Sequence, residues 1–155
     1  MSGATTILYK RATFVTQLPI AHLYLPSHGW LSEVSPGRWR VGYTKFALRM
    51  LGELVDVQFE RQPGTPVAAG DIVGSIEGFK AVSDLYCAGA GRFRGGNPAL
   101  SEDLEWVARD PYAAGWLYEF DGVPDSRAFG VHAYRDLLDG TIDRILAQQK
   151  ADETP

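Results

Sequence analysis

Apolar and polar residues alternate in several short runs that glycine and proline separate. The clearest run covers residues 54–59, and similar runs cover residues 72–76 and 82–86. Alternation with a period of two, in segments rich in β-branched and aromatic side chains, is typical of half-buried strands. Residues 5–9 and 13–18 also favour strands, but the sequence leaves open whether they form an edge strand or an N-terminal arm. The same pattern predicts strands at residues 23–25, 39–43, 92–94 and 115–120, and an approach to the sheet at Val67.

A helical period replaces the alternation in three places. The first predicted helix begins after Thr44, a suitable N-cap, and ends at Gly52, a residue typical of helix C-termini. Its apolar residues share one face: Phe46, Ala47, Met50 and Leu51. Ser101 is predicted to cap a short helix over residues 101–107. A longer apolar stripe predicts a helix over about residues 131–149, which Gly140 is expected to kink or break.

Many short strands with a few helices favour a small β-sandwich or a flattened barrel. A length of 155 residues is typical of one domain, and it is sufficient to bury a core without a disulfide. We expect a single domain over residues 1–155, with its core at about residues 20–140. An N-terminal arm and a frayed polar segment at residues 150–155 flank that core.

Composition excludes several classes of protein. The single cysteine, Cys87, forms no internal disulfide, so a reducing cytoplasm is the expected compartment. No stretch reaches about 18 apolar residues and no secretory signal pattern is present, so we expect no membrane association. The net charge is -4 and the basic residues form no stripe, which argues against nucleic-acid binding. The histidines and the cysteine lack metal-ligand spacing, so no metal site is expected.

The candidate chemistry lies in the turn over residues 77–81, between two predicted strands. The turn presents Lys80 at its tip, and lysine is scarce among the 15 basic residues of the chain. Arginine cannot serve as an amine nucleophile because its guanidinium stays protonated. An exposed lysine flanked by Glu77 and Asp84 suits covalent modification by a dedicated ligase.

This turn resembles the lipoylation hairpin of the glycine cleavage H-protein family. The family carries Glu-Ser-Val-Lys-Ala, then Ser-Asp and a later Ser-Gly. This chain has Glu77-Gly78-Phe79-Lys80-Ala81, then Ser83-Asp84 and Gly91. Further pieces of the family pattern follow in order over about residues 24–138: Ser27-His28-Gly29-Trp30, Val41-Gly42-Tyr43-Thr44, Leu51-Gly52-Glu53-Leu54-Val55, Asn97-Pro98-Ala99-Leu100, Asp110-Pro111-Tyr112 and Gly115-Trp116-Leu117.

The resemblance implies a hybrid barrel-sandwich of the lipoyl type, with short helices and a C-terminal helix. It also implies lipoate amide-linked to Lys80 as a swinging arm, on a carrier that is not itself an enzyme. A lipoate-protein ligase or the lipoyl synthase system would attach the group. The residues expected to supply ligase recognition and the environment of the arm are Glu77, Gly78, Phe79, Ala81 and Asp84.

The chain departs from the family where aminomethyl-carrying members use Glu, His and Asp to hold the loaded arm. The matching positions are Gly29, Phe46 and Asp84, so two of the three polar groups are absent. A sheltered cationic amine without polar partners is costly, which favours a different cargo. Three short segments of the chain are similar to the H-like lipoate-binding proteins of bacterial cytoplasmic sulfur oxidation. They are Gly-Phe-Lys-Ala at residues 78–81, Leu-Tyr-Cys at 85–87 and Thr-Lys-Phe-Ala at 44–47. That similarity implies a cargo cleft of Gly29, Phe46 and Cys87.

The favoured partner is therefore a heterodisulfide-reductase-like complex. The alternative is a glycine cleavage H protein, which carries the aminomethyl group from glycine decarboxylase and works with aminomethyltransferase and dihydrolipoamide dehydrogenase. A biotinyl carrier is disfavoured because biotin acceptors place methionine on both sides of the lysine, where this chain has Phe79 and Ala81.

Two readings from other classes remain open. An independent enzyme with Cys87 as nucleophile has no histidine near it in sequence, and His28 is more typical of a hydrogen-bonded structural residue. An interaction module with Phe79 as a docking aromatic is compatible with a carrier, because a carrier must also be recognised by its partners.

Overall fold

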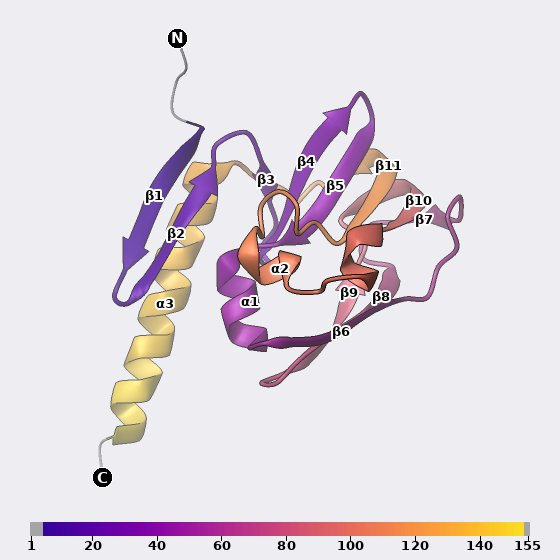
Figure 1. Ribbon diagram of the computed structural model, residues 1–155. Helices are drawn as coiled ribbons and strands as arrows, with labels where there is room; N and C mark the ends of the chain where they lie inside the picture. The colour runs from indigo at the N-terminus through magenta and orange to yellow at the C-terminus, as the bar shows by residue number, and fades with distance from the viewer. Residues whose placement is uncertain (1–4, 154–155) are drawn as a thin grey trace.

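The computed structural model describes residues 5–153, and within that range the chain forms mainly antiparallel strands (Figure 1). The larger sheet has the order β3 (Leu23–Tyr24), β4 (Gly29–Ser35), β5 (Arg38–Tyr43), β11 (Tyr118–Pro124), β10 (Gly89–Gly96) and β7 (Pro66–Val67). A smaller sheet has the order β6 (Leu54–Phe59), β8 (Ile72–Gly78) and β9 (Val82–Tyr86). The predicted mainly β architecture is confirmed.

The main hydrophobic core lies between these two sheets. Ile76 and Leu85 contribute fully buried side chains from the smaller sheet, and Leu31, Phe93 and Phe120 contribute them from the larger one. Side chains of a strand alternate between its two faces, so one polar face and one apolar face result from the sequence pattern. This burial joins the two sheets into the expected barrel-sandwich.

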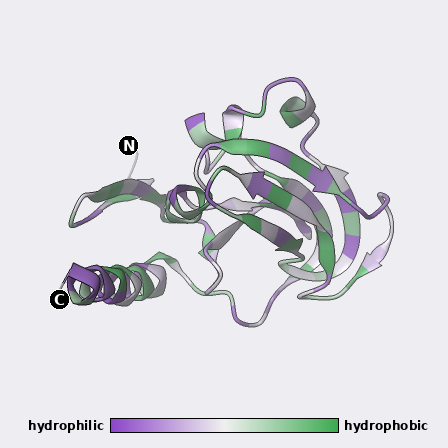
Figure 2. Ribbon diagram, turned by 90° about the horizontal axis from the view of Figure 1, so that it is seen from below, coloured by the Kyte–Doolittle hydropathy of each residue, from purple (hydrophilic) through white to green (hydrophobic). Residues whose placement is uncertain are grey.

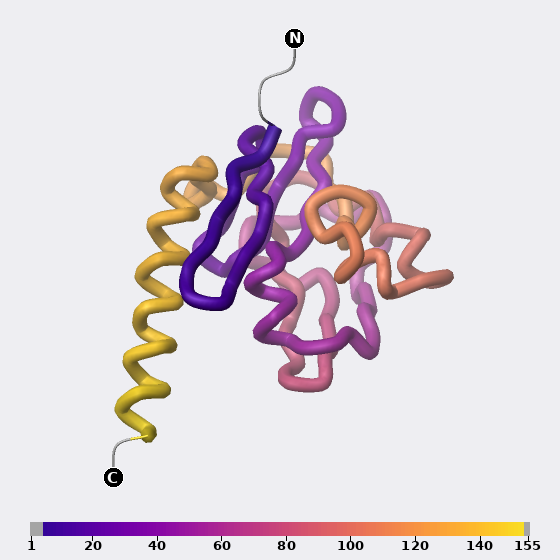
Figure 3. The backbone as a smooth tube through the Cα atoms, turned by 60° about the vertical axis from the view of Figure 1, so that its left-hand side comes forward, coloured from indigo at the N-terminus to yellow at the C-terminus, as the bar shows by residue number. Residues whose placement is uncertain are grey.

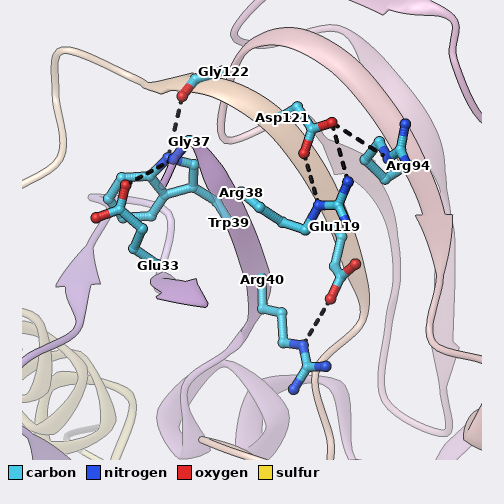
Figure 4. Close-up of polar contacts among 9 residues, drawn as sticks. All are labelled: Glu33, Gly37, Arg38, Trp39, Arg40, Arg94, Glu119, Asp121 and Gly122. Atoms are coloured by element: carbon cyan, nitrogen blue, oxygen red, sulfur yellow. Dashed lines mark hydrogen bonds and ion pairs between the residues drawn. The ribbon is translucent and has the colours of Figure 1, made fainter. Parts of the chain in front are cut away.

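Charged side chains link three neighbouring strands of the larger sheet (Figure 4). Arg40 lies opposite Glu119 with a nitrogen–oxygen distance of 2.8 Å, and Arg38 lies opposite Asp121 at 2.9 Å. Arg94 of β10 also reaches Asp121, at 3.4 Å. The hydrogen bond from Arg38 lowers the pKa of the Asp121 carboxyl group. These groups are largely solvent-accessible, so screening limits their contribution to stability.

The N-terminal segment forms a separate hairpin of β1 (Thr6–Arg11) and β2 (Phe14–Pro19). Figure 2 shows this hairpin together with α3 (Val131–Glu153) on one side of the sandwich. A second cluster of buried side chains fills the space between them and reaches α1: Tyr9, Phe14, Leu18, Phe46, Tyr134, Leu138 and Ile142. Arg11 donates two hydrogen bonds of 2.8 Å to the Asp143 carboxylate, and Tyr9 donates one of 2.8 Å to Asp139.

The first predicted helix is confirmed as α1 (Lys45–Leu51). The Thr44 hydroxyl accepts a hydrogen bond from the Ala47 N–H group at 3.4 Å, as an N-cap does. Gly52 ends the helix at a φ of 77°, a value that favours glycine. Met50 was expected on the buried face, but its side chain is 52% exposed. Leu48 takes part in the core instead, because α1 packs against both core clusters.

Three other helix and strand predictions need correction. Instead of one helix over residues 101–107 there is a 3-10 turn at Pro98–Ser101 and a single turn, α2, at Trp106–Arg109. The cap is Asn97 rather than Ser101, because the Asn97 side chain accepts from the Ala99 N–H group at 3.0 Å. The last strand begins at Tyr118, three residues later than predicted.

The C-terminal helix is longer and more regular than predicted. Gly140 does not interrupt α3, which runs without a break from Val131 to Glu153. The segment expected to fray, residues 150–155, is helical as far as Glu153, and residues 154–155 lie outside the described range, as do residues 1–4. No helix within residues 5–153 combines the length and the apolar character that crossing a membrane requires.

Candidate functional site

The predicted lysine turn joins β8 and β9 at one end of the smaller sheet. The Gly78 N–H group donates to the Ala81 carbonyl at 2.9 Å, which closes the turn. The tip is then fixed to the end of α1, because the Lys80 N–H group donates to the Leu51 carbonyl at 2.9 Å. A third bond, of 3.0 Å, runs from the Phe79 N–H group to the Glu53 carbonyl. The backbone of the turn is therefore held in place while its side chains remain exposed.

Two glycines permit this close approach of the turn to α1. A Cβ atom on Gly78 would lie 2.2 Å from the Leu51 carbonyl oxygen, closer than atoms can approach. A Cβ atom on Gly52 would lie 2.9 Å from Cγ of Lys80, and the positive φ of Gly52 already disfavours other residues. The glycine at position 78, where the family usually has serine, thus fits the tight contact in this chain.

The side chain of Lys80 is exposed, and its ammonium group has one weak polar contact. Nζ donates to the Arg49 carbonyl oxygen at 3.4 Å. Within residues 5–153, Lys80 takes part in no ion pair at 4.0 Å or less. An amine in this position is accessible to a modifying enzyme, since little must be broken to free it.

Two hollows lie beside Lys80, and its side chain lines both. The larger, of about 620 Å³, lies between the β1–β2 turn, α1, β6 and the segment around Leu104. The second, of about 340 Å³, lies between the β1–β2 turn, α1 and the second half of α3. Neither hollow was predicted from the sequence, because the residues that line them come from segments far apart in the chain.

The three residues expected to form a cargo cleft do not come together. Gly29 lines a small hollow of about 110 Å³ together with Ser83, whereas Phe46 lines the hollow of 340 Å³. Cys87 is 2% exposed and belongs to the main core. Its place in the cleft is therefore a wrong prediction, since this side chain, just beyond the end of β9, lies in the core and does not reach the surface. Burial also raises the pKa of the Cys87 thiol, which keeps it protonated and unreactive.

The other residues around the lysine have the placement expected of a recognition surface. Glu77 is exposed near the end of β8, Asp84 is exposed in the middle of β9, and Ala81 is exposed within the turn. Phe79 is 75% exposed, an unusual state for an aromatic side chain. Their role in ligase recognition stays a prediction.

His28 is a structural residue. Its Nδ1 atom lies 2.9 Å from the Tyr134 hydroxyl group, and its ring centre lies 4.8 Å from that of Phe46. Desolvation by burial lowers the pKa of His28 to about 4. The same Tyr134 hydroxyl lies 2.7 Å from the Thr44 hydroxyl group, so this cluster joins α3 to the start of α1.

Comparisons with known proteins agree with this geometry. The family model described as glycine cleavage H-protein matches residues 22–128. The glycine cleavage system H protein of Citrobacter koseri is 34% identical over 136 residues, which are 88% of this chain and all of that protein. The one from Nocardia farcinica is 38% identical over 116 residues, 75% of this chain and 86% of that protein. The chain belongs to the glycine cleavage H-protein family.

The structural comparison supports the same family. A crystal structure of a glycine cleavage system H protein from Mycobacterium marinum has a TM-score of 0.68 and 34% sequence identity. It covers 76% of this chain, and the match includes 95% of the M. marinum chain. Members of the family are carriers without catalysis of their own, and they bear lipoate covalently on a lysine. These predictions are confirmed, whereas the sulfur-oxidation specialisation finds no support in the comparisons.

The residues of this chain fit a lipoyl group. An exposed lysine stands at the tip of a backbone-anchored turn, and hollows of about 620 and 340 Å³ lie beside it. Two further residues next to the lysine are Arg49 and Met50 of α1, which sequence analysis did not single out. Their helix was predicted, but its contact with a turn 30 residues later has no local signal in the sequence.

Proposed function

We propose that this protein is a lipoyl carrier whose arm is attached to Lys80. The observation that carries the proposal is the turn itself. It has an exposed amine at its tip, and the N–H groups of Lys80 and Phe79 bond to Leu51 at the end of α1 and to Glu53 just after it. Lys45, by comparison, lies at the start of α1 and donates a hydrogen bond of 2.9 Å to the Val15 carbonyl oxygen. Lys80 is therefore better placed for modification than Lys45.

Attachment joins Nζ of Lys80 to the carbonyl carbon of lipoate as an amide; a carboxyl C–O bond breaks, and its oxygen leaves, in the net reaction, as water with two protons from the lysine ammonium group. The lysine loses its positive charge, and the net charge of the chain changes from -4 to -5. When bound, the lipoyl group supplies a disulfide–dithiol pair that accepts and releases cargo. The chain contributes a fixed base for the arm, because the Leu51 and Glu53 carbonyls hold the turn. Tethering keeps the cargo at high local concentration near successive partner enzymes.

For the cargo, the comparisons favour the aminomethyl group of glycine cleavage. The named relatives are glycine cleavage H proteins, and they support glycine decarboxylase, aminomethyltransferase and dihydrolipoamide dehydrogenase as partners. The share of each relative that is matched, 86–100%, supports a shared role over the whole carrier.

A sulfur cargo handled by a heterodisulfide-reductase-like complex is the second candidate, and one observation favours it. Gly29 and Phe46 stand where aminomethyl-carrying members are expected to use a carboxylate and an imidazole. Phe46 packs edge-on against Phe14 with ring centres 5.5 Å apart, so no polar group reaches the arm from that position. A cationic amine would lack the partners that offset its desolvation.

Intact-protein mass after co-expression with a lipoate-protein ligase tests the attachment. We expect the native chain to gain the mass of one lipoyl group, located at Lys80 by peptide mapping. The Lys80→Arg variant should gain none, and the matched Lys45→Arg variant should be modified like the native chain. An unshifted native mass would reject the proposal. To separate the cargoes, the lipoylated protein is added to glycine decarboxylase with glycine: release of carbon dioxide supports glycine cleavage, and its absence favours the sulfur cargo.

A further inference from the structure

The hollow of about 340 Å³ beside Lys80 is formed in large part by residues outside the part of the chain that matches the family model. That match covers residues 22–128, whereas β1, β2 and α3 lie before and after it. The hollow is lined by Thr13 and Phe14 of the hairpin and by Ile142 and Leu146 of α3. Figures 1 and 3 show the β1–β2 turn close to both α1 and α3. The two additions to the matched core thus meet next to the proposed attachment point.

The walls of this hollow include apolar side chains from the hairpin, α1 and α3, beside the polar Arg11, Arg49 and Gln149. Met50 is 52% exposed and Leu146 is 43% exposed, although both are large hydrophobic residues. Phe14 and Phe46 lie deeper and are buried. Exposed apolar side chains gathered around a hollow of a few hundred cubic ångströms are typical of a binding site.

We propose that the unloaded lipoyl arm of Lys80 rests in this hollow, against Met50 and Leu146. The inference depends on the proposed attachment at Lys80, whose side chain already lines the hollow. A lipoyl group on an amide bears no charge, and its aliphatic chain ends in a cyclic disulfide. Such a group gains from burial against apolar side chains, and methionine sulfur adapts well to irregular neighbours. Because the arm is tethered, weak contacts are sufficient to hold it.

The charges around the hollow agree with a neutral arm. Arg49 forms no ion pair within residues 5–153; it donates to the Thr13 hydroxyl at 3.4 Å and lies 5.8 Å from the centre of the Phe14 ring. No carboxylate is among the residues lining this hollow, whereas Glu53 and Glu105 line the larger one. An arm ending in an ammonium group would therefore find no partner here. The hollow that includes Ser27, His28 and Ser83 is a different one, of about 180 Å³, which Lys80 does not line.

Hydrogen exchange of the intact protein, in its unmodified and lipoylated forms, tests this inference. Peptides that cover residues 142–149 and residues 46–51 should exchange several-fold more slowly after lipoylation. The Leu146→Gln variant should lose this protection, because an amide in place of an isobutyl group removes apolar contact with the arm. The matched Ala147→Gln variant, at an exposed neighbouring position on α3 that lines no described hollow, should keep it.

The outcomes separate this inference from the proposed function. If mass spectrometry finds no lipoyl group on Lys80, the attachment itself fails. If Lys80 is lipoylated but residues 142–149 exchange at the same rate in both forms, the carrier stands and the resting site is overturned. Protection confined to residues 104–108 would place the arm in the larger hollow and would overturn it as well. Protection that appears without lipoylation and grows with protein concentration would mean that a second copy covers this face.

Discussion

Acidification should weaken the fold through His28. In the folded chain its imidazole is half-buried between Phe46 and Tyr134, and desolvation lowers its pKa from 6.5 to about 4. In the unfolded chain it titrates near 6.5. Between these two values the unfolded state binds more protons, so the free energy of unfolding falls as the pH falls. This stability is fully present above pH 6.5 and is progressively lost toward pH 4.

The size of the effect follows from the two pKa values. At pH 5 the unfolded histidine is almost fully protonated and the folded one is almost fully neutral. The difference in proton binding lowers the free energy of unfolding by about 2 kcal/mol relative to pH 8. For a domain with a stability of about 5–15 kcal/mol, such a loss is easily measured.

Urea unfolding at pH 8 and at pH 5 measures this loss, with the His28→Asn variant as the control. His28 has a φ of 71°, and asparagine tolerates that conformation better than other non-glycine residues. The variant loses ring packing at both pH values, so only its pH dependence is compared with that of the native chain. We expect the variant to fall by about 2 kcal/mol less between the two conditions. Equal falls in the two proteins would refute the reasoning, as would an NMR titration of His28 in the folded protein with a midpoint near 6.5.

Two further predictions concern the turn and the core. Gly78→Ala should push the lysine turn away from the Leu51 carbonyl, lower the free energy of unfolding by about 1–3 kcal/mol and slow lipoylation. Gly130→Ala should have none of these effects, because a Cβ atom there meets nothing within 4 Å. Equal stability of the two variants in chemical denaturation would contradict this prediction. Cys87 should not react with a thiol reagent in the native protein and should react once the protein is unfolded, because the thiol lies in the core. For the same reason, Cys87→Ala should leave the rate of lipoylation unchanged. Rapid labelling of the folded protein would argue against this burial.

The sequence predicted those parts of the fold that have local causes. The clean alternation of residues 54–59 coincides with β6, and Thr44 and Gly52 mark the ends of α1 because caps act within one turn. The lysine turn was also predicted, since its glycine and its flanking strands are adjacent in the chain. Asn97 was not predicted as the cap because Ser101 is an equally suitable residue type. The backbone conformation at Asn97, just before Pro98, decides which of the two residues caps the turn.

Non-local contacts were beyond the same reasoning. Nothing in residues 6–19 indicates that the hairpin packs against a helix that begins at Val131. Met50 fits the apolar stripe of α1, yet it is exposed because the neighbouring elements leave a hollow there. Cys87 lies just beyond the end of β9, in the connection to β10, and its burial depends on how that connection packs against the main core. The site was therefore predicted at Lys80 and not at the walls beside it.

The pairing of Arg11 with Asp139 and Asp143 has a consequence for any shortened version of this protein. Those contacts, together with the side chains of Tyr9 and Phe14, join the two extremities of the polypeptide to each other. Deleting the first twenty residues would expose part of the second core cluster on α3, and deleting α3 would expose part of the same cluster on the hairpin. A version cut at the limits of the family match lacks both pieces, so it exposes Phe46 and should aggregate unless Phe46 is replaced by a polar residue.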